Sequence, residues 1–499
     1  MKHLLKSKFL LVLALTALLA FALGACSNND ETPDEDDSAN ALVVGEVDWN
    51  FYTERAESFL LAMASNNFDE AQDMLNAEMI EALDSADIEL QDIWESNLAQ
   101  AGAFLSIYET EYFAENGFYF VEITLRHEYS GILERIALTE DGLVAGWHTL
   151  FPSLEETDAR ETAGFTDYPI IIGEGTDFPL NGMLSMPDDV TGPVPAVVIV
   201  QGSGPHNMDG STIGNSTIYR DIAEFLAANG IAVVRYDKRT YAHIGRMVQE
   251  FGDSITVREE VIEDAVFAAE LLRADPRIDE NSVFIIGHSL GGMLAPRIHA
   301  EGGDFAGLIL MAGSPRHLLE LMSEQFRASV SGMHEQTEIE IEAGAMTREE
   351  AEEALEAFGL DDFLAEAEAM DALLEALFDM PREVAKETST PVVGGMMPYY
   401  LWDFAMHPFT DYVHDIDIPI LVIQGSRDFQ ILADVDFVLL QELFAEHDNV
   451  TFNLYENLNH IFFSSTAINF NQHAAEIVLG SEHVDTQALQ DIVDWILGR

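Results

Sequence analysis

A series of short apolar runs, alternating with helical stretches, constrains the fold of this chain more than any other sequence feature. Each run ends near a loop, and together they cover residues 196–202, 231–237, 283–287, 307–313 and 420–425. Amphipathic segments such as IYRDIAEFLAANG lie between them. Strands that are apolar throughout and separated by helices are typical of a parallel sheet covered on both faces. We therefore predict an α/β domain whose ligands bind at the carboxyl ends of the strands.

The first 26 residues have the organisation of an export signal. Three lysines precede an apolar run over residues 9–23, and the small residues Gly24 and Ala25 then precede Cys26. The ending LGAC resembles the bacterial lipoprotein cleavage box, which implies that Cys26 becomes the lipidated first residue of the mature protein. An ordinary signal peptide or an uncleaved anchor is the alternative. We expect an exported protein that a lipid at Cys26 anchors to the outer face of the cell membrane.

The charge of the chain excludes one class of partner. The formal net charge is −66, and removal of residues 1–25, which carry three lysines and no acid, makes it −69. Because phosphate contacts need clustered lysines and arginines, we expect no nucleic-acid partner. The acidity is spread along the chain, which favours a salty or alkaline environment, with plain solubility as the alternative. Cys26 is the only cysteine, so no disulfide can form within the chain.

One serine, Ser289, stands at the end of an apolar run in the segment VFIIGHSLGGMLAP. Residues 287–291 fit the Gly-x-Ser-x-Gly pattern of a nucleophile elbow, a sharp strand-to-helix turn that exposes the serine hydroxyl. The pattern alone is weak, and an ordinary glycine-rich turn is the alternative. The apolar run before it and the helix-compatible run after it favour the elbow. Ser289 is therefore the predicted nucleophile.

A serine nucleophile needs a base within hydrogen-bond reach and a third group that holds the base. In elbow folds the chain order is serine, then acid, then histidine. Asp428 follows the run at 420–425, and His460 follows the next strand-like segment, VTFNLY. We expect these two residues to complete a triad; a loop-capping aspartate and a surface histidine are the alternatives. Three further histidines lie before that strand or beyond His460 and compete less well: His447, His473 and His483.

Two backbone N–H groups must point at the oxyanion that forms when the serine attacks a carbonyl. Leu290, the residue after the nucleophile, is expected to supply one of them, helped by the dipole of its helix. The second is expected from the GSGP loop after the run at 196–202, where Ser203 is the first choice and Gly204 the reserve. A glycine- and proline-rich turn without such a role is the alternative.

Several segments together resemble the α/β-hydrolase superfamily, in particular its bacterial esterase and dienelactone-hydrolase-like or serine-aminopeptidase-like branch. They are VPAVVIVQGSGP, GIAVVRYDKRTY, DPRIDENSVFIIGHSLGGMLAP, ILVIQGSRD and NLNH. The resemblance covers residues 168–499 and implies a Ser289, Asp428 and His460 triad. The chain departs from many relatives at Gln201, where they have histidine, which bears on the geometry of the oxyanion loop.

The rest of the chain divides into an acidic tether over residues 26–48 and a small α+β domain over 49–152. The small domain carries no catalytic constellation and loosely resembles a domain of unknown function that often precedes exported hydrolases. Within the hydrolase-like domain at 168–499, helical patterns over about 314–408 form an insertion. It contains a capping box at Thr347 and Glu350 and is expected to overhang the strand ends as a lid.

These observations favour a lipid-anchored serine hydrolase that cleaves carboxylic esters through an acyl-enzyme, with a small ester or acyl compound as substrate. A peptidase or thioesterase with the same triad, and a binding lipoprotein without turnover, are the alternatives. The sequence implies neither a metal nor an organic cofactor, because it has no His/Cys cluster with ligand spacing and no phosphate-binding glycine loop.

Overall fold

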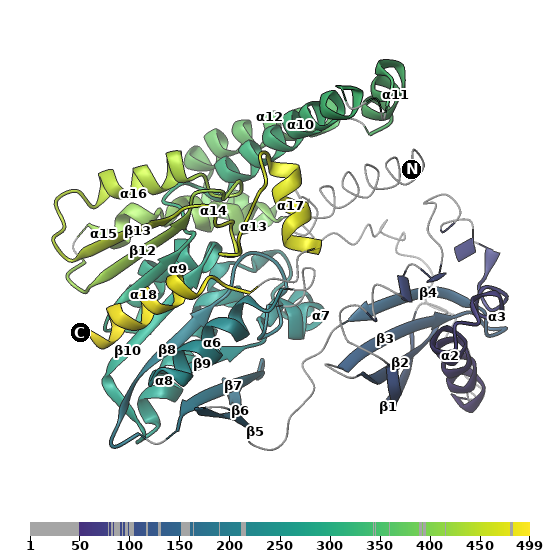
Figure 1. The fold of residues 1–499 in the computed structure, drawn as a ribbon, viewed down its shortest axis with the longest axis horizontal. Helices are drawn as coiled ribbons and strands as arrows, with labels where there is room; N and C mark the ends of the chain where they lie inside the picture. The colour runs from purple at the N-terminus through teal and green to yellow at the C-terminus, as the bar shows by residue number, and fades with distance from the viewer. Residues whose placement is uncertain are drawn as a thin grey trace. The chain divides into compact units, whose positions relative to one another are not determined.

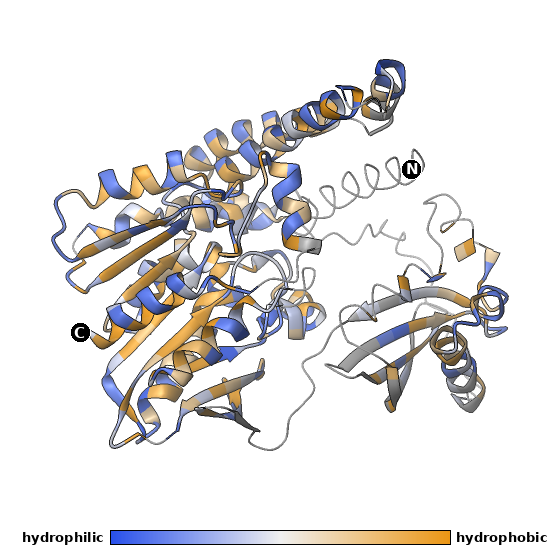
Figure 2. Cartoon of the chain, viewed as in Figure 1, coloured by the Kyte–Doolittle hydropathy of each residue, from blue (hydrophilic) through white to orange (hydrophobic). Residues whose placement is uncertain are grey.

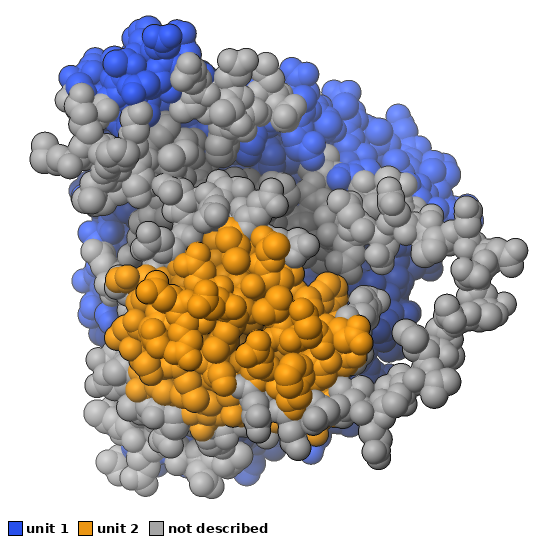
Figure 3. All heavy atoms as spheres, turned by 90° about the vertical axis from the view of Figure 1, so that its right-hand side faces the viewer, with its two compact units in different colours: residues 1–28, 156–499 blue, residues 29–155 orange. Residues whose placement is uncertain are grey.

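The computed structural model describes residues 49–499, apart from a set of short gaps. The described residues form two compact units, one within residues 29–155 and the other within 156–499 (Figure 3). No helix among the described residues combines the length and apolar character needed to cross a bilayer. Nothing is described for the first 48 residues or for the gaps, which are residues 78, 81–82, 84–89, 92, 95–97, 99–103, 116–117, 128–130, 151–159, 163, 189, 211–215, 343, 345, 359, 389–391, 393–395, 415 and 480–482.

The small unit is a four-stranded antiparallel sheet with helices packed against it. Its strands, in spatial order, are β1 (Phe104–Glu115), β2 (Phe118–His127), β3 (Gly131–Leu138) and β4 (Val144–Leu150). Alternate residues of β2 are buried against helix α2 (Trp49–Ala64), which α3 (Phe68–Gln72) follows. The alternation of buried and less buried side chains is what an antiparallel sheet with one covered face requires.

The large unit is built on a nine-stranded sheet with the order β13-β12-β11-β10-β8-β9-β7-β6-β5. Strands β8 to β13 run parallel, whereas β5, β6 and β7 form an antiparallel edge. The predicted domain start at residue 168 falls inside β6, so the sheet begins earlier than the apolar runs indicated. The strands are β5 (Arg160–Thr162), β6 (Phe165–Ile172), β7 (Leu180–Pro187), β8 (Val194–Val200), β9 (Ala232–Tyr236), β10 (Ile278–His288), β11 (Leu308–Met311), β12 (Ile420–Gly425) and β13 (Val450–Tyr455).

Helices cover both faces of this sheet (Figure 1). Val197 and Ile199 of β8 pack with α6 (Ile218–Ala228) and α18 (Thr486–Leu497) on one face. Val198 and Val200 pack with α8 (Glu263–Ala274) and α9 (Leu290–Ile298) on the other. Both sets are apolar because both faces are buried, and Figure 2 shows mostly orange, apolar colour in the central strands of this sheet.

The predicted insertion is helical and lies between β11 and β12. Helices α10 and α12 lie side by side, with α11 at their far end (Figure 1). Thr347 and Glu350 form the predicted capping box, since each side chain accepts from the other residue's backbone N–H at the start of α11. The helices are α10 (Leu318–Glu342), α11 (Arg348–Phe358), α12 (Leu360–Asp379), α13 (Arg382–Glu387), α14 (Pro398–Met406) and α15 (Phe409–Val413).

Candidate active site

Ser289 occupies the turn between β10 and α9, at the carboxyl edge of the sheet. Its backbone has φ 54° and ψ −116°, a combination that residues with a side chain rarely adopt. A hydrogen bond stabilises the turn: the Ser289 N–H donates to the carbonyl oxygen of Met311, the last residue of β11, at 2.9 Å. A strained serine at this point is the geometry expected of a nucleophile elbow.

Two glycines next to Ser289 allow backbones to come into direct contact. A Cβ atom on Gly287 would lie 2.2 Å from the carbonyl oxygen of Gly291. One on Gly291 would lie 2.3 Å from the carbonyl oxygen of Val200, at the end of β8. Both distances are far inside van der Waals contact, so only glycine fits at these positions.

Asp428 and His460 meet across the ends of β12 and β13. His460 Nδ1 lies 2.8 Å from Asp428 Oδ2, and both side chains are buried. The carboxylate also accepts from the backbone N–H groups of Gln430 and Ile431 and from the side-chain amide of Gln424. Burial alone would raise the pKa of Asp428, but the His460 ring and these hydrogen bonds hold it below its usual value.

His460 also lies close to the elbow through its backbone. The carbonyl oxygen of His460 is 3.0 Å from Nε2 of His288, the residue before Ser289, and the two imidazole rings are 4.9 Å apart. Among the residues that the structure describes, no hydrogen bond joins the Ser289 hydroxyl to the His460 ring. Such bonds are often long without substrate and shorten when it binds.

The competing histidines lie elsewhere. His483 is exposed and interacts with Asp221. His447 packs against Phe444 at the end of α16 (Val438–Leu443). His473 is buried in α17 (Phe470–Leu479) beside Phe429, and its charge would act on Asp428, but no hydrogen bond between these two described residues is formed. Of these histidines, His460 is the one that binds Asp428.

The loop after β8 lies directly against the serine. A Cβ atom on Gly202 would lie 3.2 Å from Cβ of Ser289. The Gly202 N–H donates to the Tyr219 hydroxyl at 3.0 Å, and Lys238 Nζ donates to the Gly202 carbonyl oxygen at 2.9 Å. His206 Nε2 lies 2.7 Å from the carbonyl oxygen of Ser203. Burial and the charge of Lys238 lower the pKa of His206 to about 4, so the ring is neutral near neutral pH.

His288, Tyr219 and Lys238 were not among the predicted site residues. The Tyr219 hydroxyl lies 3.2 Å from His288 Nδ1, so a chain of hydrogen bonds runs from Gly202 through Tyr219 and His288 to the His460 carbonyl. Burial and the charge of His460 lower the pKa of His288 to about 3. Gln201 is buried, and its side chain donates to the Tyr236 carbonyl oxygen. The sequence offered one indication of these supporting residues: lysine is rare in this chain, and Lys238 lies directly after a predicted strand.

A pocket of about 390 Å³ lies between α9 and the insertion. Met293 and Leu294, one turn beyond Ser289, line one side, and Phe404 and Phe409 line another. Phe404 lies in α14 and Phe409 begins α15, so both belong to the insertion. The lining is mostly apolar, which suits an acyl or alkyl group, but Ser289, Asp428 and His460 are not among the residues that line this pocket.

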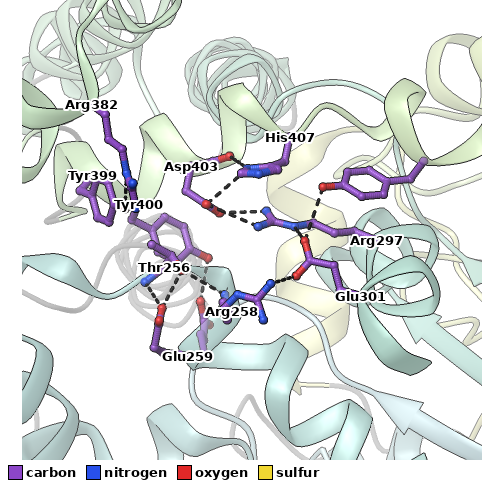
Figure 4. Close-up of polar contacts among 12 residues, drawn as sticks. Thr256, Arg258, Glu259, Arg297, Glu301, Arg382, Tyr399, Tyr400, Asp403 and His407 are labelled. Atoms are coloured by element: carbon purple, nitrogen blue, oxygen red, sulfur yellow. Dashed lines mark hydrogen bonds and ion pairs between the residues drawn. The ribbon is translucent and has the colours of Figure 1, made fainter. Parts of the chain in front are cut away.

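An ion-pair network beside this pocket ties the insertion to α9 (Figure 4). The Arg297 guanidinium, at the end of α9, binds Asp403 of α14 at 2.8 Å and Glu301 at 2.8 Å. Glu301 also pairs with Arg258, and His407 contacts Asp403. Nearby, the Tyr400 hydroxyl donates to Glu260 at 2.7 Å.

A parallel sheet covered on both faces, with a strained serine between a central strand and its helix, defines the α/β-hydrolase fold. The predicted fold class is thereby confirmed, and the chain is a serine hydrolase that resembles carboxylesterases. A family profile described as "Serine aminopeptidase, S33" matches residues 196–466. This is more than half of the chain, which therefore belongs to that family. A second profile, for a protein family of unknown function, matches residues 56–147 in the small unit.

Among curated proteins, the chain is similar to Esterase EstD from Thermotoga maritima. The two are 28% identical over 464 residues, which cover 92% of this chain and 98% of the relative. Among solved structures, Est1E from Butyrivibrio proteoclasticus is 13% identical with a TM-score of 0.37, over 66% of this chain and 99% of that one. A putative dienelactone hydrolase from Klebsiella pneumoniae is 13% identical with a TM-score of 0.36, over 67% and 99% of the two chains.

Proposed function

We propose that this protein is an extracytoplasmic, lipid-anchored hydrolase that cleaves small carboxylic esters through an acyl-enzyme on Ser289. The observation that carries the proposal is the buried hydrogen bond between His460 and Asp428 beside the elbow serine. The similarity to Esterase EstD favours an ester as the substrate. The family description, which names an aminopeptidase, keeps an amide substrate as the second candidate.

In the proposed mechanism, the Ser289 oxygen attacks the ester carbonyl carbon while His460 Nε2 takes the hydroxyl proton. Asp428 accepts from His460 Nδ1, which fixes the tautomer that leaves Nε2 free to accept and stabilises the imidazolium. The carbonyl oxygen becomes an oxyanion, which the N–H groups of Leu290 and Ser203 bind. The C–O bond to the alcohol then breaks, and His460 returns the proton to the leaving oxygen. A water molecule, deprotonated by His460, hydrolyses the acyl-enzyme in the same way and regenerates the serine.

The test is the pair of substitutions Ser289→Ala and His460→Ala, assayed with p-nitrophenyl esters. Each should lower kcat by several orders of magnitude, and the double variant should lose little more, because the two groups act as a unit. His483→Ala, which removes an exposed histidine, is the matched control and should keep full activity. Wild-type turnover by a folded Ser289→Ala protein would overturn the proposal.

Labelling and substrate panels separate the alternatives. A fluorophosphonate should label Ser289 in the wild-type protein, whereas a binding lipoprotein without turnover would stay unlabelled. Ester, anilide and thioester substrates with one acyl group then compare leaving groups directly. We expect the ester to have the highest kcat/KM, and a higher value for the anilide would indicate a peptidase.

The location outside the cytoplasm and the lipid anchor rest on the sequence, because Cys26 lies outside the described residues. Support comes from the order of lysines, apolar run and small residues before Cys26. When the full chain is expressed in bacteria fed labelled palmitate, the mature protein should carry the label and sediment with membranes. Cys26→Ser should abolish labelling, and a labelled Cys26→Ser protein would exclude this residue as the lipid site.

A further inference from the structure

Lys238 is an unusual residue in this chain. The sequence has five lysines. Three lie within the first eight residues, Lys386 is on the surface, and Lys238 is the fifth. Lys238 follows β9, and its side chain is only 2% exposed. Burying an ammonium group costs several kcal/mol unless it is paired and hydrogen-bonded, so a buried lysine in a lysine-poor chain calls for a specific set of partners.

Lys238 has one side-chain partner in the loop that faces Ser289 and another in the segment that contains Glu260. Its Nζ is 2.9 Å from the carbonyl oxygen of Gly202 and 2.6 Å from Oε1 of Glu260. Its own backbone N–H donates to the carbonyl oxygen of His206, 2.9 Å away. Lys238 therefore holds the loop over residues 202–206 at both ends, once with its side chain and once with its backbone.

The bond to Gly202 determines how the next peptide group is oriented. The peptide bond between Gly202 and Ser203 is trans, so the Ser203 N–H points opposite to the Gly202 carbonyl and away from Lys238. Tyr219 fixes the N–H on the other side of Gly202 at 3.0 Å. A donor directed at an oxyanion contributes most when it needs no reorientation during the reaction. The charge-assisted hydrogen bond from Lys238 to the Gly202 carbonyl opposes rotation of the peptide group between Gly202 and Ser203.

We propose that Lys238 is a positioning residue that orients the Ser203 N–H in the oxyanion hole, an inference that rests on the proposed hydrolase function. Glu260, in the segment η2 (Arg258–Ile262), neutralises and holds the ammonium group. The second carboxylate oxygen of Glu260 accepts from the hydroxyl of Tyr400, which lies in α14 of the insertion. The insertion is thus joined to the oxyanion loop through three hydrogen bonds in series, from Tyr400 to Glu260 to Lys238 to Gly202.

The first test is Lys238→Met, which keeps the length of the side chain and removes the ammonium group. We expect kcat for p-nitrophenyl esters to fall about 10- to 100-fold with KM nearly unchanged, since an oxyanion donor acts in the transition state alone. Affinity for a boronic acid, which mimics the tetrahedral intermediate, should fall by a similar factor, whereas affinity for the carboxylate product should not. Lys386→Met makes the same substitution at an exposed lysine and should change none of these values.

A second variant separates positioning from stability, because Lys238→Met leaves Glu260 buried without its cation. In Lys238→Met/Glu260→Gln both charges are gone, and the amide can still accept from Tyr400. The double variant should recover the melting temperature but not kcat. Recovery of kcat together with the melting temperature would show a purely structural role and overturn the inference, as would wild-type kcat in folded Lys238→Met.

The same measurements distinguish failure of this inference from failure of the proposed function. If the wild-type protein neither hydrolyses esters nor reacts with a fluorophosphonate, the proposed function is wrong and this inference is rejected with it. If the wild-type protein does both and Lys238→Met equals it in kcat and boronic-acid affinity, only the positioning role is wrong. Tyr400→Phe should cause a smaller loss of kcat that is not additive with Lys238→Met, because both changes act on one chain of contacts.

Discussion

The strained backbone of Ser289 is stable because the neighbouring positions have no side chains. With Gly287 and Gly291 on either side, the backbones of β10, α9 and the end of β8 can approach one another directly around the turn that carries Ser289. A side chain at Gly287 or Gly291 would therefore displace the main chain that holds Ser289 in place, so packing around the turn and the position of the serine depend on each other.

Gly291→Ala tests this steric argument. The new Cβ would lie 2.3 Å from the Val200 carbonyl oxygen in a central strand, which cannot move without disturbing the sheet. We expect a loss of stability of about 1–3 kcal/mol, the usual range for overpacking, and little remaining ester hydrolysis. Urea denaturation and initial rates measure both effects.

The control is Gly245→Ala, in helix α7 (Arg239–Phe251), where a Cβ would meet nothing within 4 Å. Alanine is favoured over glycine in a helix by about 1 kcal/mol, so this variant should be as stable as the wild-type protein or more so. Equal behaviour of the two alanine variants would show that contact with Val200 is unimportant.

At the scale of elements, the insertion is held to the sheet domain by buried charges as well as by apolar packing. Arg297 at the end of α9 binds Asp403 of α14, and both side chains are largely buried. Apolar packing in α12 is confined to a narrow stripe: the side chains of Ala367 and Met370 are inaccessible, whereas Leu364 is 38% exposed.

Arg297→Met should destabilise the protein by about 3–5 kcal/mol, because the largely buried Asp403 would lose the guanidinium that compensates its charge. Arg348→Met is the matched control, since Arg348 pairs with Glu338 on the surface of the insertion, where solvent screens the pair and its contribution to stability is small. Both variants would be compared by thermal and urea denaturation. Equal losses of stability would contradict the assigned role of the buried pair.

At the scale of the whole molecule, charge opposes compactness. The chain has 89 acidic residues against 23 lysines and arginines, and the acids are distributed along its length. Self-repulsion of this kind favours expansion and is reduced by salt. At about 0.01 M ionic strength the Debye length is roughly 30 Å, which spans a domain, whereas at about 1 M it is roughly 3 Å.

We therefore expect the melting temperature to rise between low and molar sodium chloride. Individual exposed pairs contribute little, but their sum competes with a net stability of about 5–15 kcal/mol. An isosmotic neutral solute, which does not screen charge, is the control and should raise the melting temperature much less. A melting temperature that is flat in salt would show that the acidic surface serves solubility alone.

The fold class and the elbow could be predicted from sequence because their signals are local. Continuous apolar runs indicate strands that are buried on both faces. Glycines two positions before and two positions after Ser289 indicate a turn that has no room for side chains. The antiparallel edge was missed for a related reason: β6 contains Pro169 and alternates in burial, so it lacks the continuous apolar run of the central strands. The roles of the predicted site residues stay predictions until the substitutions are made; these residues are Ser289, Asp428, His460, Leu290 and Ser203.

The sequence by itself determined where the central strands, the elbow turn and the helical insertion lie, since periodicity and glycine placement are properties of neighbouring residues. Only the tertiary structure decided which side chains support the site. Lys238 binds a carbonyl 36 positions away, and Arg297 binds an aspartate 106 positions away. Contacts of this kind depend on the order in which strands assemble into the sheet and on how the insertion folds back over it. The pattern of neighbouring residues does not specify how the strands are arranged in space, so the partners of buried polar side chains can be identified only from the tertiary structure.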